Sequence, residues 1–144
     1  MIVGFYAILI VLSDQITKFI ILKKMLPGES LPVVNSVFHL TLVFNKGGAF
    51  GIFSNAAAFF IFISVLVIGA ITVFLLRKDQ ARAIRIAMVF VASGAASNLI
   101  DRLRFGYVVD FLDFRIWPVF NIADSAITIG TIYLCIRYFL KSRV

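Results

Sequence analysis

Two aspartates in the second half of the chain, Asp110 and Asp124, are candidates for chemistry because each lies among apolar residues. Burial disfavours the charged form of a carboxyl group, and two carboxyl groups held close together share one proton. The ionised member of such a pair can take a proton from water, and the neutral member can donate one to a peptide carbonyl. The pattern therefore favours metal-free hydrolysis of a peptide bond.

Other nucleophiles and metal ligands are scarce in this sequence. His39 is the only histidine and Cys135 the only cysteine, so no thiolate metal cluster is available. Cys135 lies in an apolar run and is more simply a small packing residue of a helix than half of a Cys/His pair. We expect neither a metal nor a cofactor.

Asp124 alone also has a structural explanation. Asn121 could cap the start of a helix, and Asp124, three residues later, would favour the positive end of the helix dipole. That explanation leaves out Asp110, a second aspartate with apolar neighbours that we expect at the same face of the protein.

Two further polar groups lie in or beside apolar runs, where ionisable residues are costly. Asp14 and Lys18 are four residues apart on one helix face, and they are either a neutralising pair or part of a site. Asn98, Asp101 and Arg102 project to one side of another helix. Arg102 either holds a buried carboxylate or a substrate oxygen, or forms a simple ion pair at the helix end.

The elements that position these residues are predicted from composition and hydropathy. The chain has 144 residues, of which 62% are hydrophobic and 15% charged, with a mean hydropathy of +1.05. Soluble domains are less apolar and more highly charged. Four stretches have the length of a membrane span, at about 2–22, 56–76, 83–100 and 123–140. We predict a single domain, 1–144, built as an all-α membrane bundle of four transmembrane helices.

A β-strand is predicted between the first two spans. Alternate residues from Phe38 to Phe44 are apolar, whereas the other face carries His39, Thr41 and Asn45, with Val43 as an exception. Pro-Gly and Gly-Gly pairs bound this region. We expect a small sheet over the mouth of the bundle.

The charged residues predict an orientation. The formal net charge is +7, but the basic residues are scattered between apolar runs and form no face for nucleic acid, so we expect contact with lipid headgroups instead. Lys and Arg are densest in the 77–85 loop and the C-terminal tail, which places both termini in the cytoplasm. Most of the acids then fall at the outer face.

Five blocks of the chain resemble, in order and spacing, those of the lipoprotein signal peptidase (signal peptidase II) family. They are DQITK at 14–18, NKGGAF at 45–50, NLIDR at 98–102, GYVVDF at 106–111 and FNIAD at 120–124. The family usually has Gly where this chain has Ser97. The resemblance covers nearly the whole chain, including the four spans.

The resemblance implies an aspartic endopeptidase of the bacterial cytoplasmic membrane. Such enzymes remove the signal peptide from diacylglyceryl-modified prolipoproteins by cutting just before the lipidated cysteine. It implies a catalytic pair of Asp110 and Asp124, an outer sheet and short helix at about 31–55, and a monomer among membrane lipids. The residues that would bind substrate or support the site are Asp14, Lys18, Asn45, Gly48, Asn98, Asp101, Arg102, Asn121 and Ala123.

Two other functions are compatible with parts of the pattern. A small four-helix transporter would use Asp14 as its coupling carboxylate. An assembly factor without chemistry would tolerate Asn at both Asp110 and Asp124. The transporter leaves Asp110 and Asp124 without a role, and the long segment between the first two spans also argues against it.

Overall fold

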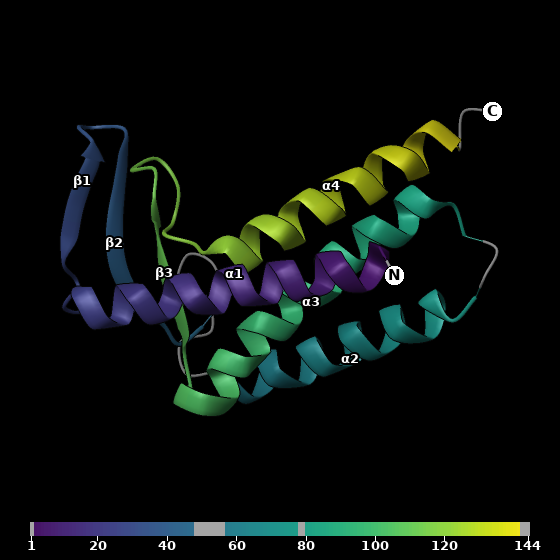
Figure 1. The fold of residues 1–144 in the computed structure, drawn as a ribbon, viewed down its shortest axis with the longest axis horizontal. Helices are drawn as coiled ribbons and strands as arrows, with labels where there is room; N and C mark the ends of the chain where they lie inside the picture. Colours follow the sequence, from purple (N-terminus) through teal and green to yellow (C-terminus); the bar gives the residue numbers. More distant parts are fainter. Residues whose placement is uncertain (1, 48–56, 78–79, 142–144) are drawn as a thin grey trace.

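The computed structural model describes residues 2–47, 57–77 and 80–141. Its helices are α1 (Ile2–Lys24), α2 (Ala57–Leu75), α3 (Arg82–Phe105) and α4 (Ile122–Lys141), and its strands are β1 (Ser30–Val34), β2 (Phe38–Asn45) and β3 (Val108–Asp113). These four helices are all long and apolar enough to cross a membrane. The predicted membrane bundle with a small sheet is confirmed (Figure 1).

Helix α3 continues five residues beyond the predicted end of its apolar run, to Phe105. Gly106 ends it in the left-handed conformation, with φ of 77°, and its N–H donates to the Arg102 carbonyl at 3.0 Å. Arg102 and Arg104 lie in the last turn, where positive charge stabilises the helix. The helix is therefore longer than its apolar run, and it carries Asp101 and Arg102 as the spacing predicts.

Helix α3 lies at the centre of the bundle and packs against each of the other three helices. Its contact with α4 depends on two glycines. A Cβ at Gly94 would collide with the Ala123 carbonyl oxygen, and one at Gly130 would lie 2.6 Å from the Ala87 carbonyl oxygen. Small residues thus bring the two backbones close together. This proximity places the start of α4, with Asp124, beside Asn98.

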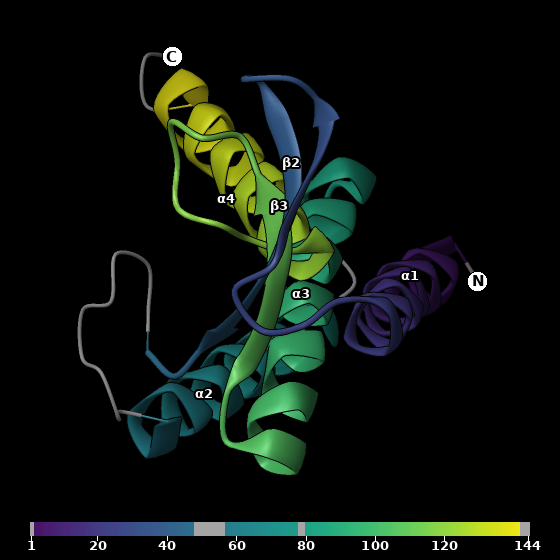
Figure 2. The ribbon, with the colours of Figure 1, turned by 90° about the vertical axis from the view of Figure 1, so that its left-hand side faces the viewer.

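The three strands form one antiparallel sheet in the order β1-β2-β3, across one end of the bundle (Figures 1 and 2). We call this the sheet end; α1 begins and α4 ends at the other. The sheet packs on the last turns of α1 through a buried apolar cluster of Ile21, Met25, Leu42, Val109 and Phe111. Because Val109 and Phe111 point into this cluster, Asp110 between them points to the opposite face.

Part of one prediction lies outside the described residues. The strands β1 and β2 occupy the first part of the 31–55 segment. The short helix expected in the rest of that segment, and Gly48, fall within 48–56.

Candidate active site

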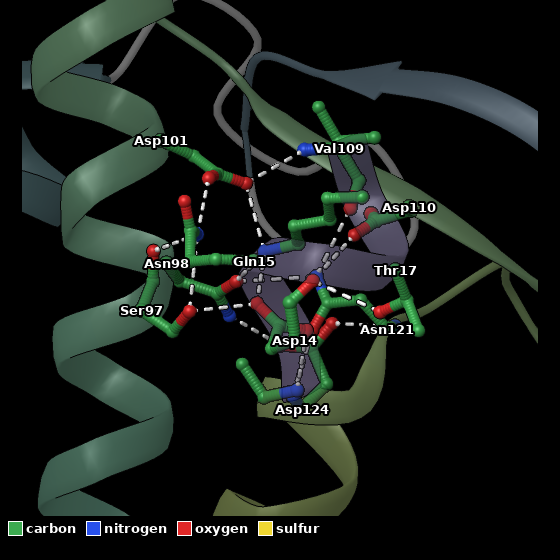
Figure 3. Close-up of polar contacts among 12 residues, drawn as sticks. Asp14, Gln15, Thr17, Ser97, Asn98, Asp101, Val109, Asp110, Asn121 and Asp124 are labelled. Carbon is green, nitrogen blue, oxygen red and sulfur yellow. Dashed lines mark hydrogen bonds and ion pairs between the residues drawn. The ribbon is translucent and has the colours of Figure 1, made fainter. Parts of the chain in front are cut away.

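Asp110 and Asp124 come from different elements and are joined by one asparagine side chain (Figure 3). Asp110 lies in the middle of β3 and Asp124 in the first turn of α4. The Asn121 amide nitrogen donates to Asp110 Oδ1 at 2.7 Å, while its Oδ1 accepts the Asp124 backbone N–H at 2.8 Å. One end of this amide group therefore contacts the Asp110 carboxylate, and the other end contacts the Asp124 backbone.

Asn121 and Asp124 also form the start of α4. Asn121 precedes the first helical residue and accepts the Asp124 N–H, and Asp124 Oδ2 accepts the Asn121 N–H at 3.3 Å. This reciprocal arrangement is a capping box. The predicted cap is thus present, and it fixes the Asp124 carboxylate at the helix N-terminus.

Asp110 is buried, with 1% of its surface exposed, and receives only neutral donors. Asn45 of β2 donates to its Oδ2 at 2.9 Å, and Asn121 donates to its Oδ1. Desolvation first, and then the negative charge of Asp124, raise the pKa of Asp110 from 3.8 to about 7. This carboxyl group is therefore poised between its neutral and ionised forms near neutral pH.

Asn98 connects Asp124 to a buried ionic network. Its amide nitrogen donates to Asp124 Oδ1 at 2.7 Å, and its Oδ1 accepts the Lys18 ammonium at 2.9 Å and Asn121 Nδ2 at 3.1 Å. Since the ammonium group can only donate, it fixes which end of the Asn98 amide faces Asp124.

Lys18 forms the centre of that network. Its ammonium lies 2.7 Å from both Asp14 Oδ2 and Asp101 Oδ2, so its three donors are used by Asp14, Asp101 and Asn98. Asp14 Oδ1 accepts the Ala123 N–H at 2.9 Å, and Asp101 Oδ2 accepts the Val109 N–H at 3.1 Å. The network thus ties α1 to α3, to β3 and to the start of α4.

Both candidate carboxylates border a cavity of about 780 Å³. Its charged and amide side chains lie toward the sheet end: Asn45, Lys46, Asn98, Arg102, Asp110 and Asp124. The hydroxyl groups of Ser64 and Thr128 line it from within α2 and α4. Much of its apolar wall comes from side chains of the three helices α2, α3 and α4: Phe60, Ile63, Val67, Val91 and Ile127. A cavity with an apolar wall and a polar end suits an amphipathic ligand.

Arg102 of α3 borders this cavity and carries a positive charge. Its guanidinium lies 4.9 Å above the Phe60 ring, and Nη2 donates to the Gly47 carbonyl at 3.4 Å. Within the described part of the chain it makes no ion pair with a carboxylate, so the alternative of a simple helix-end ion pair is not found there. Its remaining donors suit an oxygen of a bound substrate.

The comparison with protein families decides the identity. A family model described as Signal peptidase (SPase) II matches residues 6–140. The chain belongs to the signal peptidase II family. The protein named lipoprotein signal peptidase from Halothermothrix orenii is 42% identical, over 95% of this chain and 94% of that protein. The one from Brevibacillus brevis is 48% identical, over 95% of this chain and 94% of that protein.

Solved structures agree with this membership in the signal peptidase II family. One, titled as a bacterial membrane enzyme, gives a TM-score of 0.93 at 35% identity and covers 97% of this chain and 88% of that chain. A second with a similar title gives a TM-score of 0.86 at 36% identity, covering 94% of this chain and 91% of the other. The predicted family and fold are confirmed, and the protein is a membrane peptidase.

Membership in the signal peptidase II family does not favour the transporter alternative, and neither does the position of Asp14. This carboxylate is fully buried and accepts hydrogen bonds from Ala123 and Ser97 in addition to its ion pair with Lys18. A coupling carboxylate needs a path to an ion, whereas every oxygen of Asp14 is engaged within the protein.

Two polar residues of the network were not among the predicted site residues. Gln15 donates from Nε2 to Asp101 Oδ1 at 2.8 Å and to Ser97 Oγ at 3.1 Å, and Ser97 donates to Asp14 Oδ2 at 2.7 Å. The signal for Gln15 was its place beside Asp14 within the first block. Ser97 had a signal too, because it replaces a glycine that the family usually has.

Acids elsewhere in the described chain are not part of the site. Asp113, also on β3, accepts hydrogen bonds from Thr41 at 2.7 Å and from the Arg115 N–H at 2.8 Å. Burial would raise the pKa of Asp113, but these hydrogen bonds together lower it below 3.8. No group of three or more His, Cys, Asp or Glu residues that could hold a metal occurs among the described residues.

Proposed function

We propose that this protein is an aspartic endopeptidase that removes signal peptides from diacylglyceryl-modified prolipoproteins, with Asp110 and Asp124 as its catalytic pair. The cut falls just before the lipidated cysteine. The observation that carries the proposal is that Asn121 donates to both cavity-facing carboxylates, from its side-chain amide to Asp110 and from its backbone N–H to Asp124. The pKa of Asp110 is also raised to about 7. The relatives named lipoprotein signal peptidase supply the substrate class.

In the proposed reaction a water molecule lies between the two carboxyl groups. The ionised carboxylate of Asp124 takes a proton from this water as its oxygen attacks the scissile carbonyl carbon. Asp110 donates its proton to the carbonyl oxygen, which gives a neutral tetrahedral centre. As that centre collapses, one of its hydroxyl groups returns a proton to Asp110 and the C–N bond breaks. The proton taken by Asp124 passes to the leaving amine, so both carboxyl groups regain their starting forms. Cleavage then declines as the pH rises above about 7, because Asp110 loses its proton.

The neighbouring residues have supporting roles in this proposal. Asn45 and Asn121 orient Asp110, and Asn98 orients Asp124. Asp14, Lys18 and Asp101 hold Asn98 and the backbone of Ala123 in place. Arg102 binds a carbonyl oxygen of the substrate. The apolar wall of the cavity receives the apolar part of the signal peptide, so that binding positions the scissile bond at the carboxylates.

We also propose that a single copy is active, with the sheet end at the outer face of the cytoplasmic membrane. Every hydrogen-bond partner of the two aspartates described above comes from one chain. Basic residues are packed closely around the helix ends at the opposite end of the bundle, which favours the cytoplasm for that end. Those present in the described segments are Arg77, Arg82, Arg85, Arg137 and Lys141.

The test is cleavage of a diacylglyceryl-modified prolipoprotein in detergent with a metal chelator present. Asp110→Asn and Asp124→Asn are each expected to abolish the size shift of the substrate. Asp113→Asn is the matched control, because it removes an acid from the same strand outside the cavity, and it should retain cleavage. Persistent cleavage by either site variant contradicts the catalytic pair. Equal cleavage of a substrate without the lipid contradicts the proposed substrate.

A further inference from the structure

The turn between β3 and α4 presents two large apolar side chains outward. Ile116 is 93% exposed and Trp117 is 61% exposed. The turn is tight: Arg115 has a positive φ of 65°, and the Ile116 N–H donates to the Phe114 carbonyl at 2.8 Å. A positive φ is unfavourable for a residue with a side chain, so this shape requires stabilising contacts.

Those contacts come from Asp113. Its Oδ1 accepts the Arg115 N–H at 2.8 Å, and its Oδ2 accepts Arg115 Nη1 at 3.2 Å and the Thr41 hydroxyl at 2.7 Å. The turn is therefore fixed to β2 and β3 through one carboxylate. Ile116 and Trp117 are held outward in a defined conformation, although water is an unfavourable surrounding for both.

The position of the turn indicates what covers these side chains. Trp117 precedes the first residue of the α4 span by five residues, and the loop after β3 leads into the start of α4 at the sheet end (Figure 1). The turn thus lies near the depth at which α4 enters the bilayer. Trp is enriched at that boundary because its ring is apolar and its N–H is polar. Farther along the α4 span, Ile129 and Ile132 are exposed apolar side chains as well.

We propose that Ile116 and Trp117 form an interfacial anchor that inserts into the headgroup boundary of the bilayer at the sheet end. Trp117 also borders the cavity, which would suit a contact with substrate. Ile116, the more exposed of the two, does not border the cavity, and a lipid contact accounts for both. The anchor is separate from the proposed cleavage, because lipid covers it whether or not substrate is bound.

Trp117 is the only tryptophan, so its fluorescence reports on this turn alone. The wild-type protein is placed in phosphatidylcholine vesicles without substrate, with bromine near the top or near the end of the acyl chains. We expect loss of emission to be larger with shallow bromine than with deep bromine, and weak quenching by aqueous iodide. Strong iodide quenching with no effect of brominated lipid overturns the proposal. Protection from iodide only after addition of substrate also overturns it, and makes the turn a substrate contact.

A substitution at Ile116 sharpens the test. Ile116→Asp is expected to weaken quenching by shallow bromine and to shift Trp117 emission to the red. The matched control is Val33→Asp, another exposed apolar residue, on the edge strand β1, which should leave both signals unchanged. Circular dichroism verifies that both variants keep their helices. Unchanged quenching in folded Ile116→Asp overturns the role of Ile116.

Discussion

Carboxylates occur in two neighbouring regions of this molecule, and the groups that contact them differ in charge between the two regions. On one side of Asn98, Asp14 and Asp101 share the Lys18 ammonium and each accepts a backbone N–H. On the other side, Asp110 and Asp124 face a cavity, and only neutral groups donate hydrogen bonds to them.

The difference separates acids that hold the fold from acids that are available for chemistry. A buried carboxylate with a cation and hydrogen bonds remains ionised and positions its partners. A buried carboxyl group that has only amide donors and a second acid nearby keeps a raised pKa, as Asp110 does. Asn98 contacts both regions, so the ionic network can orient the pair without neutralising it.

The largest expected effect comes from removing the cation of the ionic region. Lys18→Met leaves Asp14 and Asp101 buried without their counter-charge, and breaking such a buried pair costs about 3–5 kcal/mol. Thermal unfolding in detergent should show a large loss of stability or no folded protein. Lys23→Met is the control, because Lys23 is exposed on the same helix and its ammonium lies over the Phe19 ring, with no ion pair among the described residues. Equal stability of the two variants would mean that the network is dispensable.

Removing the charge of Asp110 should increase the stability of the protein, whereas removing the charge of Lys18 should decrease it. The carboxyl group titrates near 3.8 when unfolded and near about 7 when folded, so the native state binds more protons between these values. The contribution of Asp110 to the free energy of unfolding therefore falls as the pH rises across this range and is level above it. Asp110→Asn lacks this penalty, and we expect it to be more stable at neutral pH by at most about 4 kcal/mol.

Melting temperatures of wild type and Asp110→Asn across that pH range measure the effect. The gap between them should grow as the pH rises from about 4 to about 7. A gap that stays constant with pH would show that Asp110 is not buried at an energetic cost. Asp113→Asn, whose pKa is lowered in the folded protein, should instead lose stability at neutral pH.

A smaller effect is expected from replacing Arg102, which borders the cavity. Arg102→Gln removes a charged donor from substrate, which is worth about 1.5 kcal/mol, or roughly tenfold in binding. The increase should appear in KM while the stability of the protein changes little. Arg104→Gln, at the end of the same helix and stacked on Phe105, should leave KM unchanged. A fall in kcat alone would contradict a role in binding.

The smallest effect is expected inside the ionic region. Ser97→Ala removes the hydroxyl that donates to Asp14 and accepts from Gln15, at a cost of about 1 kcal/mol. Ser13→Ala is the control, since that hydroxyl donates to the Ile10 carbonyl of its own helix and is outside the ionic network. Denaturation in detergent that gives the same stability for both variants would show that Ser97 adds nothing to the network.

Contacts within one element could be predicted from the sequence, because helix geometry fixes them. Asp14 and Lys18, four residues apart, form the expected ion pair, and Asn121 and Asp124 form the expected cap. The four spans followed from hydropathy alone. The end of α3 did not, because its last turn is polar and is held by Gly106.

Contacts between elements needed the structure. Lys18 reaches Asp101 only because α1 packs on α3, and no spacing in the sequence gives that distance. Asn45 reaches Asp110 because the sheet register pairs Asn45 with Val108 and Val43 with Asp110. The irregularity in this strand pairing, between Leu40 and Val43, sets that register and is not visible in the sequence. The roles assigned to these residues remain predictions until variants are measured.

The central claim is that Asp110 holds a proton near neutral pH, and infrared spectroscopy of the protein in lipid tests it most directly. Protonated carboxyl groups have a C=O band distinct from that of carboxylates. We predict a band that disappears as the pH rises through about 7 and that is absent from Asp110→Asn but present in Asp113→Asn. If the wild-type band is already lost near the ordinary value of 3.8, Asp110 is ionised at neutral pH, and the contrast between the two regions is wrong.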